Sequence, residues 1–183
     1  ADKKANTIIS NKLNQLTPDI PILSEEGRNI PFSERSNWKY FWLIDPLDGT
    51  KEFIKKNDEF TVNIALIQNG KPTFGVVYAP ALEILYWGEV GVGAYRKDKK
   101  SLEIKINVLD ELNNPVFVAG SRSHPSERMN AFMGQFEKSQ VRPMGSSLKV
   151  CLVAEGSVHF YPRLGPTMEW DTAAAHAVLR AAK

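Results

Sequence analysis

The sequence predicts an α+β fold in which an antiparallel meander of strands with its helices is followed by a smaller α/β half. Two observations lead to this prediction. Between residues 61 and 108, short alternating segments are separated by turn residues, which is typical of a meander. Beyond residue 116 the order becomes strand, helix, helix, strand, helix. The polar stretch 110–115 separates the two patterns, so we expect one domain over residues 1–112 and another over 113–183.

The N-terminal segment predicts a helix and two strands. Apolar residues from Ala5 to Leu16 fall at helical spacing and predict a helix that ends at residues 17–19 and has Asp2 in its first turn. Short apolar runs at 20–23 and 40–44 predict strands. The polar residues 28–39 between them predict a mobile surface loop.

Five short segments make up the expected meander. They are residues 61–67, 73–78, 84–87, 93–96 and 102–108. In the last of them, apolar residues alternate with polar residues from Leu102 to Val108, which predicts one buried and one wet face.

The C-terminal part predicts two strands and three helices. Strands are expected at 116–119 and 157–161. The first helix carries an apolar stripe, which we interpret as core, at Met129, Phe132, Met133 and Phe136. A second helix opens at 145–147 and ends at Gly156, and an alanine-rich helix begins at Trp170.

Composition excludes several classes of protein. A chain of 183 residues with 43% hydrophobic and 24% charged residues is ordinary for a globular protein, and its net charge of +2 gives no general attraction to nucleic acid. No run reaches the ~18 to 20 apolar residues of a membrane helix, and the N-terminus lacks an apolar signal core, so we expect a cytoplasmic protein. Cys151 is alone, which predicts a buried small side chain. The sequence starts without Met inside an expected helix and ends without a glycine or proline stop signal, so we expect a fragment.

The stretch from Asp45 to Thr50 carries the clearest chemical signal. Asp45 and Asp48 are three residues apart across an expected turn, so their carboxylates can converge, while Gly49 has no Cβ to block a ligand. Two converging carboxylates repel each other unless one is protonated or a cation lies between them. Oxygen ligands of this kind suit Mg²⁺, and the hydroxyl of Thr50 could orient a water molecule beside it.

Other motifs with this chemistry do not fit. The acids lack the spacing of an EF-hand and of an Asp-x-Asp phosphatase, and glycine-rich nucleotide loops and a nucleophile elbow are absent from the sequence. The hypothesis that remains is metal-assisted attack of water on a phosphate ester. Taken alone, Glu25 and Glu26 are expected in a solvated turn.

Three motifs resemble the signatures of the inositol monophosphatase superfamily of Mg²⁺-dependent, lithium-sensitive phosphatases. They are Ser24-Glu25-Glu26, the stretch 42–50 and the stretch 170–174. Four further segments, 51–55, 60–65, 145–149 and 161–163, are more similar to the CysQ-type 3'(2'),5'-bisphosphate nucleotidases of that superfamily. The resemblance implies a layered αβαβα sandwich.

The resemblance also implies a metal site with two or more Mg²⁺ ions. Its ligands would be the side chains of Glu25, Asp45, Asp48 and Asp171 and the carbonyl of Leu47, with Glu26 as a weaker candidate. Asp2 and Thr50 would orient and deprotonate the attacking water, next to the metal-bound Asp48.

A phosphorylated nucleotide is the implied substrate. The residues implied to bind it are Gly49, Thr50, His124, Ser146, Lys149, Arg163 and Asp171. A lysine and an arginine suit a second phosphate that is bound but not cleaved. Without the resemblance, His124 could cap a helix and Lys149 could lie on a solvated face.

The leading hypothesis is hydrolysis of 3'-phosphoadenosine 5'-phosphate to AMP and phosphate. The alternatives are an inositol or sugar phosphatase and a non-catalytic fragment that binds metal and nucleotide. We expect a small-molecule partner, no nucleic-acid polymer and no transmembrane segment. Peripheral association with the inner membrane and any oligomeric state are compatible with the sequence.

Overall fold

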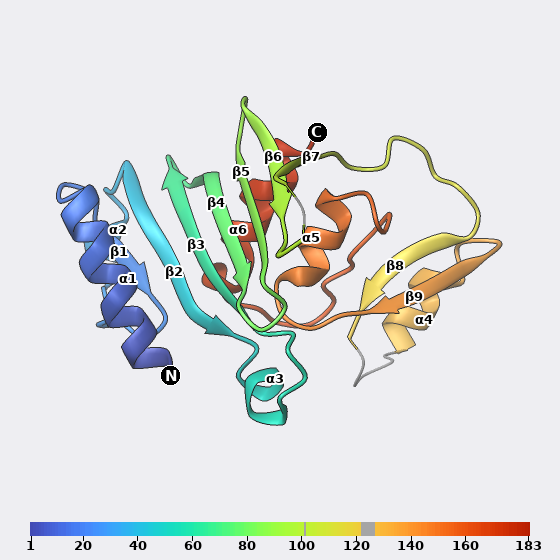
Figure 1. Ribbon diagram of the computed structural model, residues 1–183, viewed down its shortest axis with the longest axis horizontal. Coiled ribbons are helices and arrows are strands. Elements are labelled where there is room, and N and C mark those ends of the chain that lie inside the picture. Colours follow the sequence, from blue (N-terminus) through green and yellow to red (C-terminus); the bar gives the residue numbers. More distant parts are fainter. Residues whose placement is uncertain (101, 122–126) are drawn as a thin grey trace.

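The computed structural model describes residues 1–100, 102–121 and 127–183 and is dominated by a seven-stranded sheet (Figure 1). Its strands follow the chain order from one edge to the other. They are β1 (Ile22–Ser24), β2 (Tyr40–Asp48), β3 (Thr61–Gln68), β4 (Lys71–Ala79), β5 (Ile84–Glu89), β6 (Gly93–Lys97) and β7 (Ile104–Ile106). β1 is parallel to β2, and every later neighbour is antiparallel.

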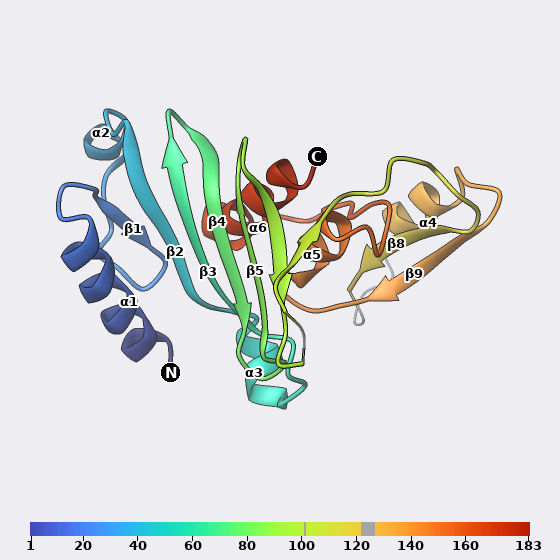
Figure 2. The same cartoon turned by 45° about the horizontal axis from the view of Figure 1, so that its top comes forward.

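Six helices accompany the two sheets in the described residues. They are α1 (Asp2–Leu16), α2 (Phe32–Arg35), α3 (Thr50–Lys55), α4 (Glu127–Met133), α5 (Leu148–Ala154) and α6 (Glu169–Ala181). Helix α6 covers one face of the large sheet, α5 packs against α6, and α1 lies along β2 near one edge of the sheet (Figures 1 and 2). Within the described residues, no helix has both the length and the hydrophobicity needed to cross a bilayer.

Close packing against the sheet determines the position of the first turn of α6. The helix is rich in buried alanines, and it meets β4 and β5 at Gly75 and Gly88. A Cβ on Gly75 would overlap the carbonyl group of Ala174, so only glycine permits this approach. The contact brings the first turn of α6, with Asp171, to the end of the sheet where β2 finishes.

A second sheet pairs β8 (Val116–Gly120) with β9 (Ser139–Pro143) in parallel. The predicted apolar stripe of α4 is half-buried rather than fully buried. Phe132 of that stripe contacts the rings of Phe136 and Phe160. The stripe is therefore part of a local aromatic cluster.

The layered α+β fold, the first helix and the meander strands β3 to β6 are confirmed. Several local predictions are wrong. The expected loop 28–39 contains α2, and the last meander strand covers only Ile104–Ile106, with Leu102 and Ile104 exposed instead of buried. The expected strand 157–161 forms only an isolated bridge at Phe160.

Besides α2, two elements were not predicted. Helix α3 follows the acidic motif directly, and β9 lies in a polar segment with little apolar alternation. The division into residues 1–112 and 113–183 stays a prediction. Helices α5 and α6 of the second part pack against each other, and α6 packs on the sheet formed by the first part.

Candidate metal centre and substrate cavity

A β-bulge at the end of β2 brings Asp45 and Asp48 to the same face of the sheet. Asp45 lies opposite Asn63 and Asp48 opposite Thr61, so three steps along β2 match two steps along β3. The extra residue restores the alternation that a spacing of three would break. The sequence predicted a turn here, which is wrong: the strand continues through Pro46 to Asp48, since a proline is tolerated at a bulge.

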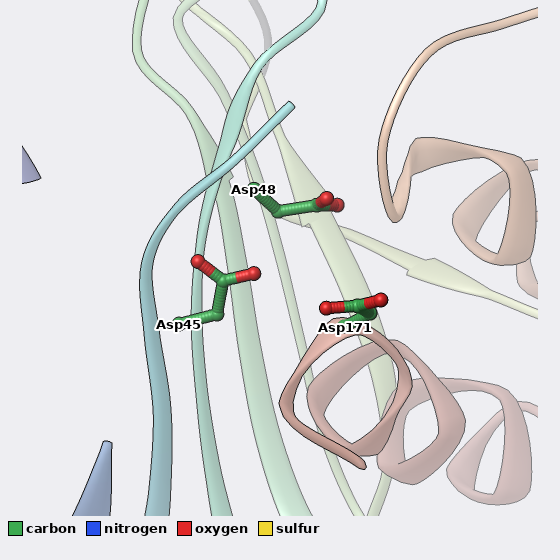
Figure 3. Close-up of side chains that lie close together, drawn as sticks. All are labelled: Asp45, Asp48 and Asp171. Atoms are coloured by element: carbon green, nitrogen blue, oxygen red, sulfur yellow. The ribbon is translucent and has the colours of Figure 1, made fainter. Parts of the chain in front are cut away.

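Asp171 completes a cluster of three acids. It comes from the first turn of α6, and one carboxylate oxygen of each of Asp45, Asp48 and Asp171 lies within 4.8 Å of the others. Figure 3 shows the three side chains around a common space between β2 and α6. Asp171 is held there because its Oδ2 accepts hydrogen bonds from the Thr167 hydroxyl at 2.8 Å and the Met168 N–H at 3.1 Å.

Burial and mutual repulsion disfavour the charged form of these acids. Asp45 is 1% exposed. Burial, followed by the charges of Asp48 and Glu25, raises its pKa to about 9. Burial also raises the pKa of Asp48 to about 6, although the nearby Lys149 ammonium opposes this rise.

These observations fit a divalent metal ion. The cluster offers only oxygen donors, which hard cations such as Mg²⁺ prefer. A cation among the three carboxylates would remove the repulsion that contributes to the raised pKa values of Asp45 and Asp48. The acids present therefore match the donor set that a metal-dependent phosphatase needs.

Glu25 and Asp2 lie beside the cluster. Burial raises the pKa of Glu25, a hydrogen bond to Asp45 lowers it, and the charges of Asp171, Glu26 and Asp2 raise it further. Glu25 lies in an exposed turn directly after β1, as expected, and from there it adjoins the acid cluster. Asp2 is the first residue of α1, and its buried Oδ1 has no hydrogen-bond partner within the part of the chain that the structure describes.

The remaining residues of the acidic motif take different positions. The N–H of Leu47 donates to Asp45 Oδ1 at 3.0 Å. Gly49 has a left-handed φ of 87°, and a Cβ there would lie 3.1 Å from Glu52 Oε2. Thr50 begins α3 and is exposed. The N-terminus and α3 lie at the same end of the molecule in both views (Figures 1 and 2), although no hydrogen bond joins Asp2 to Thr50 among the described residues.

A cavity of about 580 Å³ opens next to the acids. Six of the predicted site residues line it, namely Asp48, Gly49, Ser146, Lys149, Arg163 and Asp171. The structure thus brings two cluster acids and the two predicted cations, Lys149 and Arg163, to one cavity, which Lys51 and Arg128 also line. The cavity lining does not include the other predicted residues among those described, and His124 lies outside the described residues.

Local contacts hold the two cations in place. Lys149 is 7% exposed, and its Nζ donates to the Ser146 carbonyl at 2.7 Å and lies 5.5 Å from the centre of the Tyr161 ring. Burial lowers the pKa of Lys149, and the charge of Asp48 opposes this shift. Arg163 donates to the Pro166 carbonyl at 2.7 Å. Lys149 is therefore not the solvated surface residue that its sequence context allowed.

Sequence reasoning missed several residues of this site. Glu52 lines the cavity, and Thr61, Asn63 and Ser147 form a buried polar layer behind Asp48. The alternation of β3, which directs Thr61 and Asn63 toward the same buried face as Ala65, could have identified two of them.

The fold and the acid cluster define a metal-dependent phosphatase class, and comparison with known proteins gives the same result. Residues 1–182 match the inositol monophosphatase family, and the chain belongs to this family. Over 182 residues the chain is 50% identical to the 3'(2'),5'-bisphosphate nucleotidase CysQ of Salmonella typhimurium, and this match covers 100% of the chain and 72% of that protein. The CysQ of Escherichia coli strain K12 has the same identity and coverage.

Solved structures agree with the sequence comparison. The crystal structure of CysQ from Bacteroides thetaiotaomicron superimposes with a TM-score of 0.89 at 40% identity, covering 99% of this chain and 72% of that one. Staphylococcal IMPase-II superimposes with a TM-score of 0.78 at 25% identity, covering 99% and 67%. The fold is shared across the family, and both the identity and the superposition are higher for the CysQ structure.

Proposed function

We propose that this chain hydrolyses the 3'-phosphate of 3'-phosphoadenosine 5'-phosphate, giving AMP and phosphate, and that it does so with two or more Mg²⁺ ions. One observation carries the proposal: two of the clustered acids line the same cavity as four cationic side chains, Lys149 and Arg163 among them. The CysQ relatives, which are 3'(2'),5'-bisphosphate nucleotidases, support the substrate class.

Four acids and one carbonyl group would hold the metal ions. Asp45, Asp48 and Asp171 supply the clustered carboxylates, and Glu25 borders them. The carbonyl of Leu47 is the fifth proposed ligand, next to an N–H already bonded to Asp45. When bound, the metal supplies an activated water and neutralises charge on the phosphoryl oxygens.

The protein's own groups position the substrate around the acids. Lys149 and Arg163 bind the phosphate that is not cleaved, because both cations line the cavity that Asp48 and Asp171 also line. Ser146 and Gly49 border the same space, and the missing Cβ at Gly49 leaves room for the phosphoryl group. His124 is a further proposed contact with the nucleotide.

Asp2 and Thr50 form the proposed pair that orients the attacking water and accepts its proton. The buried, unpartnered Oδ1 of Asp2 supports this role, since such an oxygen needs a hydrogen-bond donor. The Thr50 hydroxyl lies at the exposed start of α3, one residue from the cavity-lining Gly49. The cytoplasmic location expected from the sequence stays a prediction.

A phosphate-release assay with the purified chain tests the proposal. We expect release from 3'-phosphoadenosine 5'-phosphate in Mg²⁺, at least tenfold slower release from inositol 1-phosphate, and none in excess EDTA. Faster release from the inositol ester would overturn the substrate. Calorimetric binding of the nucleotide without any release would favour a non-catalytic binding protein instead.

A further inference from the structure

Three buried polar side chains lie directly behind Asp48. Thr61, Asn63 and Ser147 are 0%, 1% and 4% exposed. The backbone N–H of Ser147 donates to Asp48 Oδ2 at 2.6 Å, and Thr61 Oγ1 lies 3.5 Å from the same oxygen. Both contacts fall on Oδ2, so neither of them uses Oδ1.

Counting protons fixes the direction of each hydroxyl group. A serine or threonine hydroxyl has one proton to donate. Ser147 donates its proton to Asn63 Oδ1 at 2.8 Å, so in the 2.8 Å contact with Ser147 Oγ the donor is Thr61. By the same count, Ser146 is the donor in its 3.1 Å contact with Thr61. The Ser147 hydroxyl is thus held from both sides, and the Ser147 amide is the main donor to Asp48.

The segment that carries Ser147 is fastened at both ends. On one side the N–H of Gly145 donates to the buried carboxylate of Glu59 at 2.7 Å. On the other side the hydroxyl contacts with β3 hold Ser147. Between them Ser146 adopts a φ of 41°, a left-handed conformation that is costly for a residue other than glycine. Surrounding contacts must therefore maintain this backbone, and β3 supplies those nearest Asp48.

We propose that Thr61, Asn63 and Ser147 are positioning residues that hold Asp48 with Oδ2 occupied and Oδ1 free for a metal ion. The inference rests on the proposed metal site. A carboxylate fixed in this way cannot rotate away from the cluster, so less order is lost when the ion binds. Loss of such supporting hydrogen bonds typically weakens metal binding by roughly 10 to 100-fold.

Substitutions at Thr61 separate this role from simple packing. Thr61→Val keeps the shape of the side chain and removes the hydroxyl, while Thr61→Ser keeps the hydroxyl. The matched control is Thr73→Val, because the Thr73 hydroxyl bonds the Leu66 carbonyl at 3.3 Å in the same sheet. Ser147→Ala removes the central hydroxyl independently.

The measurement is a titration with MgCl₂, without substrate, that takes Kd from the dependence of the melting temperature on concentration, because stabilisation grows as RT ln(1 + [Mg²⁺]/Kd). We expect this Kd to rise about tenfold or more in Thr61→Val and Ser147→Ala, and to stay within twofold of wild type in Thr61→Ser and Thr73→Val.

A wild-type Kd in a folded Thr61→Val or Ser147→Ala protein would overturn the positioning role, as would an equal weakening in Thr73→Val. If Thr61→Val does not fold, Ser147→Ala decides. A wild-type protein whose melting temperature does not respond to Mg²⁺ would instead overturn the proposed function, and this inference with it.

Discussion

Replacing Asp45 by asparagine should stabilise the metal-free protein at alkaline pH. Asp45 is 1% exposed, and burial with neighbouring negative charge raises its pKa from 3.8 to about 9. A folded-state pKa above the unfolded value means that stability is fully present below about pH 3.8 and is lost as the pH rises toward 9. Asparagine removes this loss, and its side-chain oxygen can still accept the Leu47 N–H.

The magnitude follows from proton linkage. One proton taken up on folding changes the free energy of unfolding by about 1.4 kcal/mol per pH unit. Between pH 6 and 8, the free energy of unfolding of metal-free wild type in EDTA should therefore fall by up to about 3 kcal/mol more than that of Asp45→Asn. Urea unfolding at pH 6 and 8 measures the difference, with Asp110→Asn at an exposed position as the control.

Two results would refute this reasoning. One is the same pH dependence in wild type and Asp45→Asn when both are free of metal. The other is a matching change in Asp110→Asn, which would show that overall charge rather than the buried site controls stability. Added Mg²⁺ should abolish the difference by stabilising only wild type.

Three further substitutions probe other parts of the structure. Gly75→Ala should lower the free energy of unfolding by about 1 to 3 kcal/mol, because its Cβ would overlap the Ala174 carbonyl; unchanged urea unfolding would contradict the packing of α6. Lys149→Met should raise KM for the bisphosphate nucleotide more than it lowers kcat, and an effect on kcat alone would argue against substrate binding. Tyr86→Phe should cost about 1 kcal/mol by deleting the 2.7 Å hydrogen bond to Glu155, and urea curves identical to wild type would show that this bond contributes nothing.

Sequence patterns predicted the helices and strands that bury one face along a continuous segment. Alternation located β3 to β6, and helical spacing located α1, because each pattern reflects burial of one face along a continuous segment. Helices α2 and α3 have four and six residues, too short to show a helical period. Such short helices depend on the contacts around them rather than on their own sequence.

The sequence identified the three acids that cluster and six of the residues that line the cavity, but not their geometry. The acids of β2 were evident, yet the bulge was mistaken for a turn because proline, aspartate and glycine favour both. The contact between Thr61 and Ser147 joins residues 86 positions apart, so no local pattern signals it. Their proximity depends on the tertiary structure, which places Ser147, the residue directly before α5, against β3.

The central claim is that the clustered acids hold the metal ions on which hydrolysis depends. The most direct test is phosphate release from 3'-phosphoadenosine 5'-phosphate by wild type and Asp48→Asn, alongside calorimetric titration of both proteins with Mg²⁺. We expect Asp48→Asn to stay folded, to bind Mg²⁺ at least tenfold more weakly and to release no measurable phosphate. Wild-type turnover in the folded variant would contradict the account.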